Sequence, residues 1–110
     1  MAKYEISLQA NFNEFLRYCE QSIMTGSLSA SLEDGSDFQI GEVRIAVRVF
    51  ERYSFTGSNR LSLNLTLVGR NNDITLSAIT AGGSQATLFK LNTIGEHSFL
   101  NQFISLVEQY

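Results

Sequence analysis

Apolar and polar residues alternate over several stretches of this chain, a pattern that predicts β-strands. Residues 3–9 place Tyr4, Ile6 and Leu8 between polar neighbours, as expected of a half-buried strand. The same alternation predicts a short strand and three longer ones, at residues 27–33, 42–55, 60–69 and 74–82. The sequence therefore predicts a protein built largely on a β-sheet.

Short turn-rich segments follow the predicted strands. These segments are EDGSD at 33–37, TGSN at 56–59 and RNND at 70–73. The last two are too short to hold crossover helices, so the three strands between residues 42 and 82 are expected to form an antiparallel meander.

Residues 11–26 have the periodicity of an amphipathic helix. Their apolar side chains recur at i, i+3, i+4 and i+7, which makes one face of the helix apolar. Asn11 with Glu14 three residues later forms a capping pair at the start. Gly26 is expected to end the helix in the left-handed conformation.

Residues 93–110 repeat the helical pattern, and Thr93 with Glu96 fits a capping box. A further short strand at 86–91 is an open alternative for the segment before this helix. The order β-α-β-β-β-β-α predicts an α+β fold, in which two helices pack on one face of an antiparallel sheet of about five strands.

The composition is that of one folded domain. Of the 110 residues, 44% are hydrophobic and 17% are charged, and the single cysteine excludes an internal disulfide. The net charge of −3 offers no basic field to a nucleic acid, and no apolar run is long enough for a membrane helix or a signal peptide. We therefore expect residues 1–110 to form one cytoplasmic domain without nucleic-acid or membrane partners.

Three arginines share one face of the predicted strand 42–55. Arg44, Arg48 and Arg52 project opposite a run of β-branched residues, and we expect polar residues of the next two strands beside them. The residues expected on this arginine face are Ser62, Asn64, Thr66, Thr75 and Ser77, with Ala46, Phe50, Val68 and Ile79. Such a face is a solvated surface, a site for a small anionic ligand or acidic partner, or a patch for self-association.

The stretch TAGGSQATLFK offers a second candidate site. Successive backbone N–H groups around Gly82 and Gly83 would suit an anion, with Ser84, Gln85 and Lys90 as polar neighbours. The alternative is a bulge or tight turn that only glycine tolerates. Ser84 lacks the G-x-S-x-G setting of a nucleophile.

Catalytic residues are scarce in this sequence. Cys19 lies in the apolar stripe of the first helix, where a cysteine acts as a small hydrophobic residue. His97 is the only histidine, and it has no obvious set of partners for catalysis or for zinc. We therefore predict no enzyme activity, no metal and no cofactor.

The segments VRIAVRVFERY, SAITAGGSQATLFK and GEHSFLNQF carry a resemblance to a known family. With these segments the chain resembles a family of small bacterial proteins of about this length that are catalogued as a domain of unknown function. The resemblance implies a compact domain and transfers no functional residue.

Together these observations favour a non-catalytic binding or self-associating module of the cytoplasm, with a homodimer or a protein partner. One alternative is a carrier of a small molecule or anion, with a cleft between the sheet and the helices. An enzyme is the weakest alternative, because it needs convergent titratable groups in one cleft.

Overall fold

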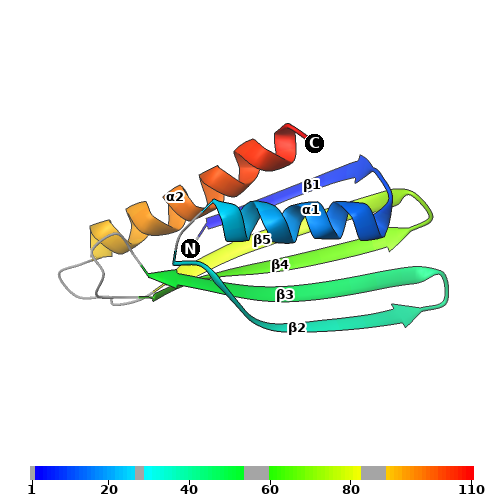
Figure 1. Cartoon of the computed structure of the whole chain (residues 1–110), viewed down its shortest axis with the longest axis horizontal. Coiled ribbons are helices and arrows are strands. Elements are labelled where there is room, and N and C mark those ends of the chain that lie inside the picture. The colour runs from blue at the N-terminus through cyan, green and yellow to red at the C-terminus, as the bar shows by residue number, and fades with distance from the viewer. Residues whose placement is uncertain (1, 27–28, 54–59, 83–88) are drawn as a thin grey trace.

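In the computed structural model, five strands form one antiparallel sheet that carries two helices on one face (Figure 1). The structure describes residues 2–26, 29–53, 60–82 and 89–110, and residues 89–98 are described by their backbone only. The elements are β1 (Ala2–Gln9), α1 (Phe12–Thr25), β2 (Ser31–Ile40), β3 (Val43–Tyr53), β4 (Arg60–Arg70), β5 (Asp73–Gly82) and α2 (Phe89–Glu108). This confirms the predicted α+β fold class.

The sheet has the order β1-β5-β4-β3-β2, so the N-terminal strand pairs with the last one. β2, β3, β4 and β5 follow one another as an antiparallel meander, as the sequence predicts for β3 to β5. Tight turns join two of its pairs. Gly41 after β2 has a φ of 59° and Asn71 after β4 has a φ of 55°, a conformation that Gly and Asn adopt at little cost.

Helix α1 forms where its capping pattern predicts. Asn11 accepts a hydrogen bond from the backbone N–H of Glu14 at 3.0 Å, which satisfies a donor at the start of the helix. The predicted left-handed stop at Gly26 is wrong. Gly26 has a φ of −77° and a ψ of −9°, and its N–H continues the helical pattern to the carbonyl of Ser22.

The start of α2 also differs from the prediction. The helix begins at Phe89, so Thr93 and Glu96 lie inside it and do not form a capping box at its start. The alternative of a short strand at 86–91 is wrong for residues 89–91, which are helical, and residues 86–88 lie outside the described part.

Strand β2 is longer and later than predicted. The segment EDGSD, expected as a turn, lies inside β2 and pairs with β3, with an irregularity in the register between Leu32 and Asp34. A bulge at this point accommodates the turn-forming residues within the ladder.

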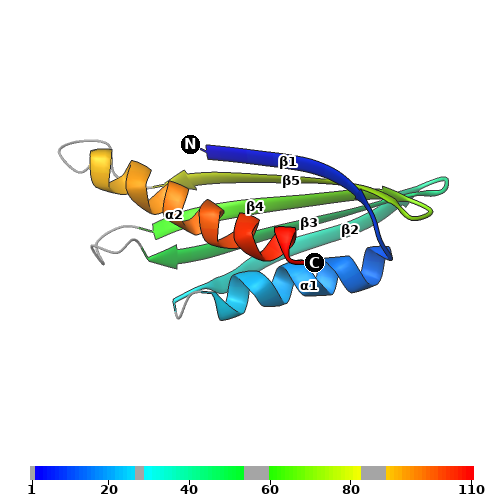
Figure 2. The same cartoon turned by 90° about the horizontal axis from the view of Figure 1, so that it is seen from above.

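The core fills the space between the sheet and the helices. α2 packs on β5, β1 and β4, and α1 lies beside it (Figure 2). Leu61, Leu63, Leu65 and Leu67 of β4 are fully buried, as are Phe50 of β3 and Phe15 and Cys19 of α1. The hydroxyl group of Tyr18 in α1 donates to the carbonyl of Leu106 in α2, which holds the two helices together.

Candidate functional site

The three arginines of β3 lie on the face of the sheet that the helices cover. Arg44, Arg48 and Arg52 pair with Gly69, Leu65 and Leu61 of β4, and residues directly opposite each other share a face. Their predicted position beside Ser62, Asn64, Thr66, Thr75 and Ser77 is therefore wrong, because those residues lie on the other face. The arginine face is turned toward the helices.

Arg48 is the most enclosed of the three, with 12% of its side chain exposed. Its Nε lies 2.7 Å from a carboxylate oxygen of Glu20 in α1, and its Nη2 lies 2.9 Å from one of Asp37 in β2. Its Nη1 donates to the carbonyls of Val47 and Ser36. Burial alone would lower the pKa of Arg48, but the hydrogen bonds and charges of Asp37 and Glu20 outweigh it and raise the pKa.

Arg44 and Arg52 also bridge β3 to a helix. The guanidinium carbon of Arg44 lies 4.3 Å from the ring centroid of Phe12, and its Nη1 donates to Oδ1 of Asn13 at 2.6 Å. The guanidinium carbon of Arg52 lies 4.4 Å from the ring centroid of Phe99 in α2. Burial lowers the pKa of Arg52.

Nη1 of Arg52 donates to Oε1 of Gln102 at 3.3 Å. Each of the three arginines therefore has protein partners on a helix. We read the set as anchors that attach α1 and α2 to β3; the prediction that it binds an anion remains a prediction.

The glycine-rich candidate site lies mostly outside the described residues. Gly82 is the last residue of β5 and pairs with Leu61, as the sequence predicts for the end of this strand. Gly83, Ser84 and Gln85 are not among the described residues, and Lys90 is placed only as part of the first turn of α2. The anion-binding corner proposed for this stretch stays a prediction.

Cys19 has the position that its sequence context predicts. Its side chain is fully buried in the core, and burial, with the charge of Glu20, raises the pKa of its thiol to about 12. A thiol with this pKa is almost entirely protonated at neutral pH and is a poor nucleophile.

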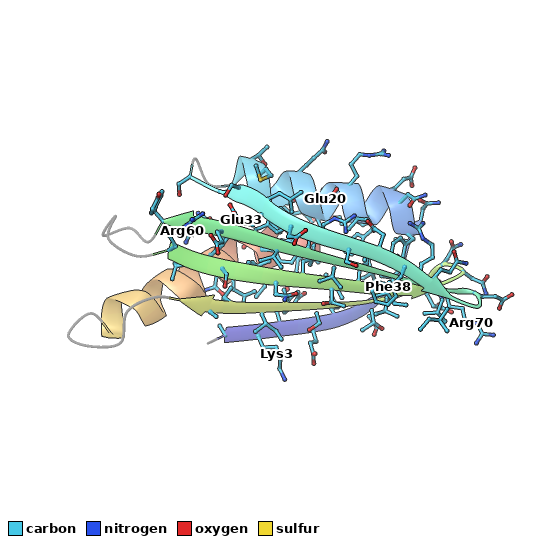
Figure 3. The ribbon with its side chains drawn as sticks, turned by 90° about the horizontal axis from the view of Figure 1, so that it is seen from below. Lys3, Glu20, Glu33, Phe38, Arg60 and Arg70 are labelled. Atoms are coloured by element: carbon cyan, nitrogen blue, oxygen red, sulfur yellow. The ribbon has the colours of Figure 1, made fainter. Side chains whose placement is uncertain are left out.

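The face of the sheet away from the helices, here called the open face, carries an unexpected set of apolar side chains. They come from β3, with two from β2 and one from β4, and we call them the apolar patch: Phe38, Ile40, Val43, Ile45, Val47, Val49 and Val68. Phe38 is 49% exposed and Val68 is 36% exposed, while the β3 members are half-buried by their neighbours. Figure 3 looks onto this face, with Phe38 labelled on β2.

Ile45 lies at the widest point of the apolar patch. It pairs with Phe38 on one side and with Val68 on the other, so three apolar side chains cross three strands in one row. Charged residues lie at the two ends of the patch. At one end, a guanidinium nitrogen of Arg60 forms ion pairs with carboxylate oxygens of Glu51 at 2.7 Å and of Glu33 at 3.3 Å. At the other end, a guanidinium nitrogen of Arg70 lies 3.6 Å from a carboxylate oxygen of Glu42 (Figure 3 labels Arg60, Glu33 and Arg70).

The open face of β1 and β5 is mostly polar, with Lys3 on β1 opposite the partly exposed Ile79 on β5. Three cross-strand pairs, which we call the polar rows, join these strands: Ser77 with Glu5, Ser7 with Thr75 and Gln9 with Asp73. A hollow of about 320 Å³ lies at the end of these strands. Its lining residues are Ser7, Leu8, Gln9, Asp73, Ile74 and Thr75, none of which is basic, so the hollow offers no cation to an anionic ligand.

Side chains fill most of the space between α1 and α2. A crevice between α1 and α2, lined by residues such as Ile23, Phe99 and Phe103, accommodates no water molecule. In the described part of the chain, no three His, Cys, Asp or Glu side chains gather where they could hold a metal ion. None of the helices in that part has the length and hydrophobicity needed to cross a membrane.

A comparison with protein families gives a match over the whole sequence. Residues 1–110 match the model of a family of unknown function, DUF6054. The chain belongs to this family. The resemblance to a domain of unknown function is thereby confirmed, and membership of DUF6054 assigns no activity and no site residue. Compared with the curated proteins, the sequence has no significant match.

The main feature that the sequence analysis missed in this DUF6054 protein is the apolar patch. The sequence pattern places the β-branched run of β3 opposite the arginines, but it does not show that this run lies on the face away from the helices. The available signal was that β3 is apolar on both sides, since Ala46 and Phe50 share the face of the arginines. Strands that are apolar on both sides are typical of sheets covered on both faces, whereas this sheet carries its helices on one face.

Proposed function

We propose that this chain is a non-catalytic module of the cytoplasm that acts by self-association through the open face of its sheet. The observation that carries the proposal is the apolar patch, which lies on a face that neither helix covers. A contiguous exposed apolar surface with charged residues at its rim is typical of a protein–protein contact.

The size of the open face supports a second copy of the chain as the partner. Five strands about 4.8 Å apart and about ten residues long, at about 3.3 Å per residue, present roughly 800 Å². A specific interface of standard size buries about 800 Å² on each partner. Two copies that meet through this face would therefore bury at most the area of a standard interface.

The two alternatives have less support. A carrier needs an apolar cavity of several hundred cubic ångströms. The crevice between α1 and α2 has no room even for water, and the hollow of about 320 Å³ at the end of β1 and β5 is lined mostly by polar residues. An enzyme needs at least two titratable groups that converge in one cleft. The titratable pairs of the described residues, such as Arg48 with Glu20, join structural elements instead.

The proposal is tested by sedimentation equilibrium from micromolar to millimolar protein. The wild-type chain is expected to form a reversible dimer, and Ile45→Lys to remain monomeric because it places a charge at the centre of the apolar patch. Gln21→Lys, on the exposed surface of α1, makes the matched charge change away from the open face and should dimerise like the wild type. Circular dichroism confirms that each variant is folded.

Two results contradict the proposal. One is a wild-type chain that stays monomeric at every concentration. The other is an Ile45→Lys variant that is folded and dimerises as tightly as the wild type.

A further inference from the structure

The open face has two chemically different halves, and they would respond differently to contact with a second copy. The apolar patch lies on β2, β3 and β4, and its seven side chains carry no charge, while Asp34 lies at its edge beside Val49. The polar rows lie on β1 and β5 and include the carboxylates of Glu5 and Asp73, both on exposed residues. Contact over the patch removes apolar surface from water, while contact over the rows removes water from two carboxylates per copy.

We infer that the two copies overlap only over β2, β3 and β4, so that β3 crosses β3 of the second copy and the polar rows stay in water. This inference rests on the proposed function and specifies the geometry of the same surface. In a two-fold symmetric contact, equivalent patches meet each other, so a patch centred on β3 places the symmetry axis beside that strand. Stacked sheets cross at about 30° and lie about 10 Å apart.

The three-strand overlap is large enough for a specific but weak contact. Three strands of about eleven residues present roughly 500 Å² per copy, or about 1,000 Å² in total. This total lies at the lower limit of biological interfaces, where transient complexes are found. The side chains around the patch, such as Ser36 and Thr66 on either side of Val47, supply a polar rim to an apolar centre.

The polar rows already satisfy their own hydrogen bonds within one copy. The hydroxyl of Ser7 lies 3.0 Å from that of Thr75, and Gln9 donates to Asp73 at 3.2 Å. A second copy placed over them would add two further carboxylates of the same sign, from its own Glu5 and Asp73. Lys3 of β1 is exposed on the same face, so a contact over the rows would remove water from charges of both signs. This desolvation disfavours an overlap that includes β1 and β5.

The chain is well suited to a test by thiol labelling. Its single cysteine, Cys19, is fully buried with a pKa of about 12, so an introduced surface thiol is the reactive one. Two variants sample the two halves: Val47→Cys lies in the apolar patch, and Ser7→Cys lies in a polar row, three strands and about 14 Å away across the sheet. The measurement is the initial rate of alkylation by iodoacetamide in dilute and in concentrated protein.

The expected result is protection at one position. When the concentration exceeds the dimer dissociation constant severalfold, alkylation of Val47→Cys should slow by about fivefold relative to dilute protein, by mass action. The rate for Ser7→Cys should change less than twofold over the same range. Fully alkylated Val47→Cys should sediment as a monomer, and fully alkylated Ser7→Cys should still dimerise.

The remaining outcomes separate failure of this inference from failure of the proposed function. Protection of both thiols, or of Ser7→Cys alone, would overturn the three-strand overlap while leaving the open face as the interface. A dimer in which neither thiol is protected would overturn both proposals, because the copies would then meet elsewhere. A wild-type monomer at all concentrations would also overturn both.

Discussion

Replacing Arg48 by methionine separates a structural arginine from a ligand-binding one. The change Arg48→Met keeps the apolar stem and removes the guanidinium group that contacts Glu20, Asp37 and two backbone carbonyls. If the arginine attaches α1 and β2 to β3, this variant must be less stable in the absence of any ligand.

The structure sets the expected loss. Two charge-assisted hydrogen bonds, at about 1.5–3 kcal/mol each, would give about 3–6 kcal/mol if both partners were buried. The side chains of Glu20 and Asp37 are 30% and 56% exposed, so water replaces part of each contact. We therefore expect Arg48→Met to lower the free energy of unfolding by about 2–3 kcal/mol.

The assay is urea unfolding followed by circular dichroism, with Arg70→Met as the matched control. Arg70 pairs with Glu42 at 3.6 Å, and the two side chains are 67% and 74% exposed, so its loss should cost less than about 0.5 kcal/mol. Glu20→Gln completes a double-mutant cycle, in which a coupling free energy of about 1 kcal/mol is expected between Arg48 and Glu20.

The structural interpretation of Arg48 would be refuted by a small effect. If Arg48→Met unfolds at the same urea concentration as Arg70→Met, then the contacts with Glu20 and Asp37 contribute nothing measurable. A ligand-binding role for the arginines would then regain its main support.

Two further predictions test the packing of the core. Gly69→Ala should destabilise the protein by about 1–3 kcal/mol, because an added Cβ would lie 2.5 Å from Cδ2 of Phe12, and Phe12→Leu in the same chain should recover part of the loss. Stability should fall as pH rises from 9 to 12, because the unfolded thiol of Cys19 ionises above its ordinary pKa of 9.0 while the folded thiol stays protonated up to about 12. Cys19→Ala should lose this part of the alkaline destabilisation in thermal melts, and an unchanged alkaline slope would contradict the assignment.

Local chemistry made helix α1 predictable. Its apolar spacing and the Asn11 cap predicted residues 11–26, and the helix spans Phe12–Thr25. Both signals depend on neighbours within four residues, which a sequence displays directly. The stop at Gly26 was assigned the wrong conformation, because a glycine permits the left-handed region without requiring it.

Pairing with a distant segment overrode local chemistry in β2. The residues of EDGSD favour turns, yet they form a ladder with β3. Position Gly35 shows one reason: a Cβ there would lie 3.0 Å from Cδ of Arg48, so glycine makes room for the buried guanidinium. This requirement comes from β3, more than ten residues away, and cannot be read from the five residues themselves.

The two faces of the sheet were harder to assign than its strands. The alternation in β3 and in β4 was predicted correctly, but the sequence does not state which face of one strand continues into which face of the next. A shift of one residue in register exchanges the faces of a strand. The sequence pattern predicts the arginines beside Ser62, Asn64 and Thr66, whereas they lie on the face of the β4 leucines. This exchange of faces concealed the apolar patch.

The resulting arrangement of β3 has an energetic consequence. Its arginine side chains point under the helices while its β-branched side chains lie on the open face, so the helices leave the seven side chains of the apolar patch uncovered. Burial of this surface on both copies favours association, because apolar surface leaves water. Area does not convert directly into affinity, since loss of translational and rotational freedom alone costs about 4–15 kcal/mol. With an apolar patch confined to three strands, the module is expected to dimerise only where its concentration is high or where a further partner holds two copies together.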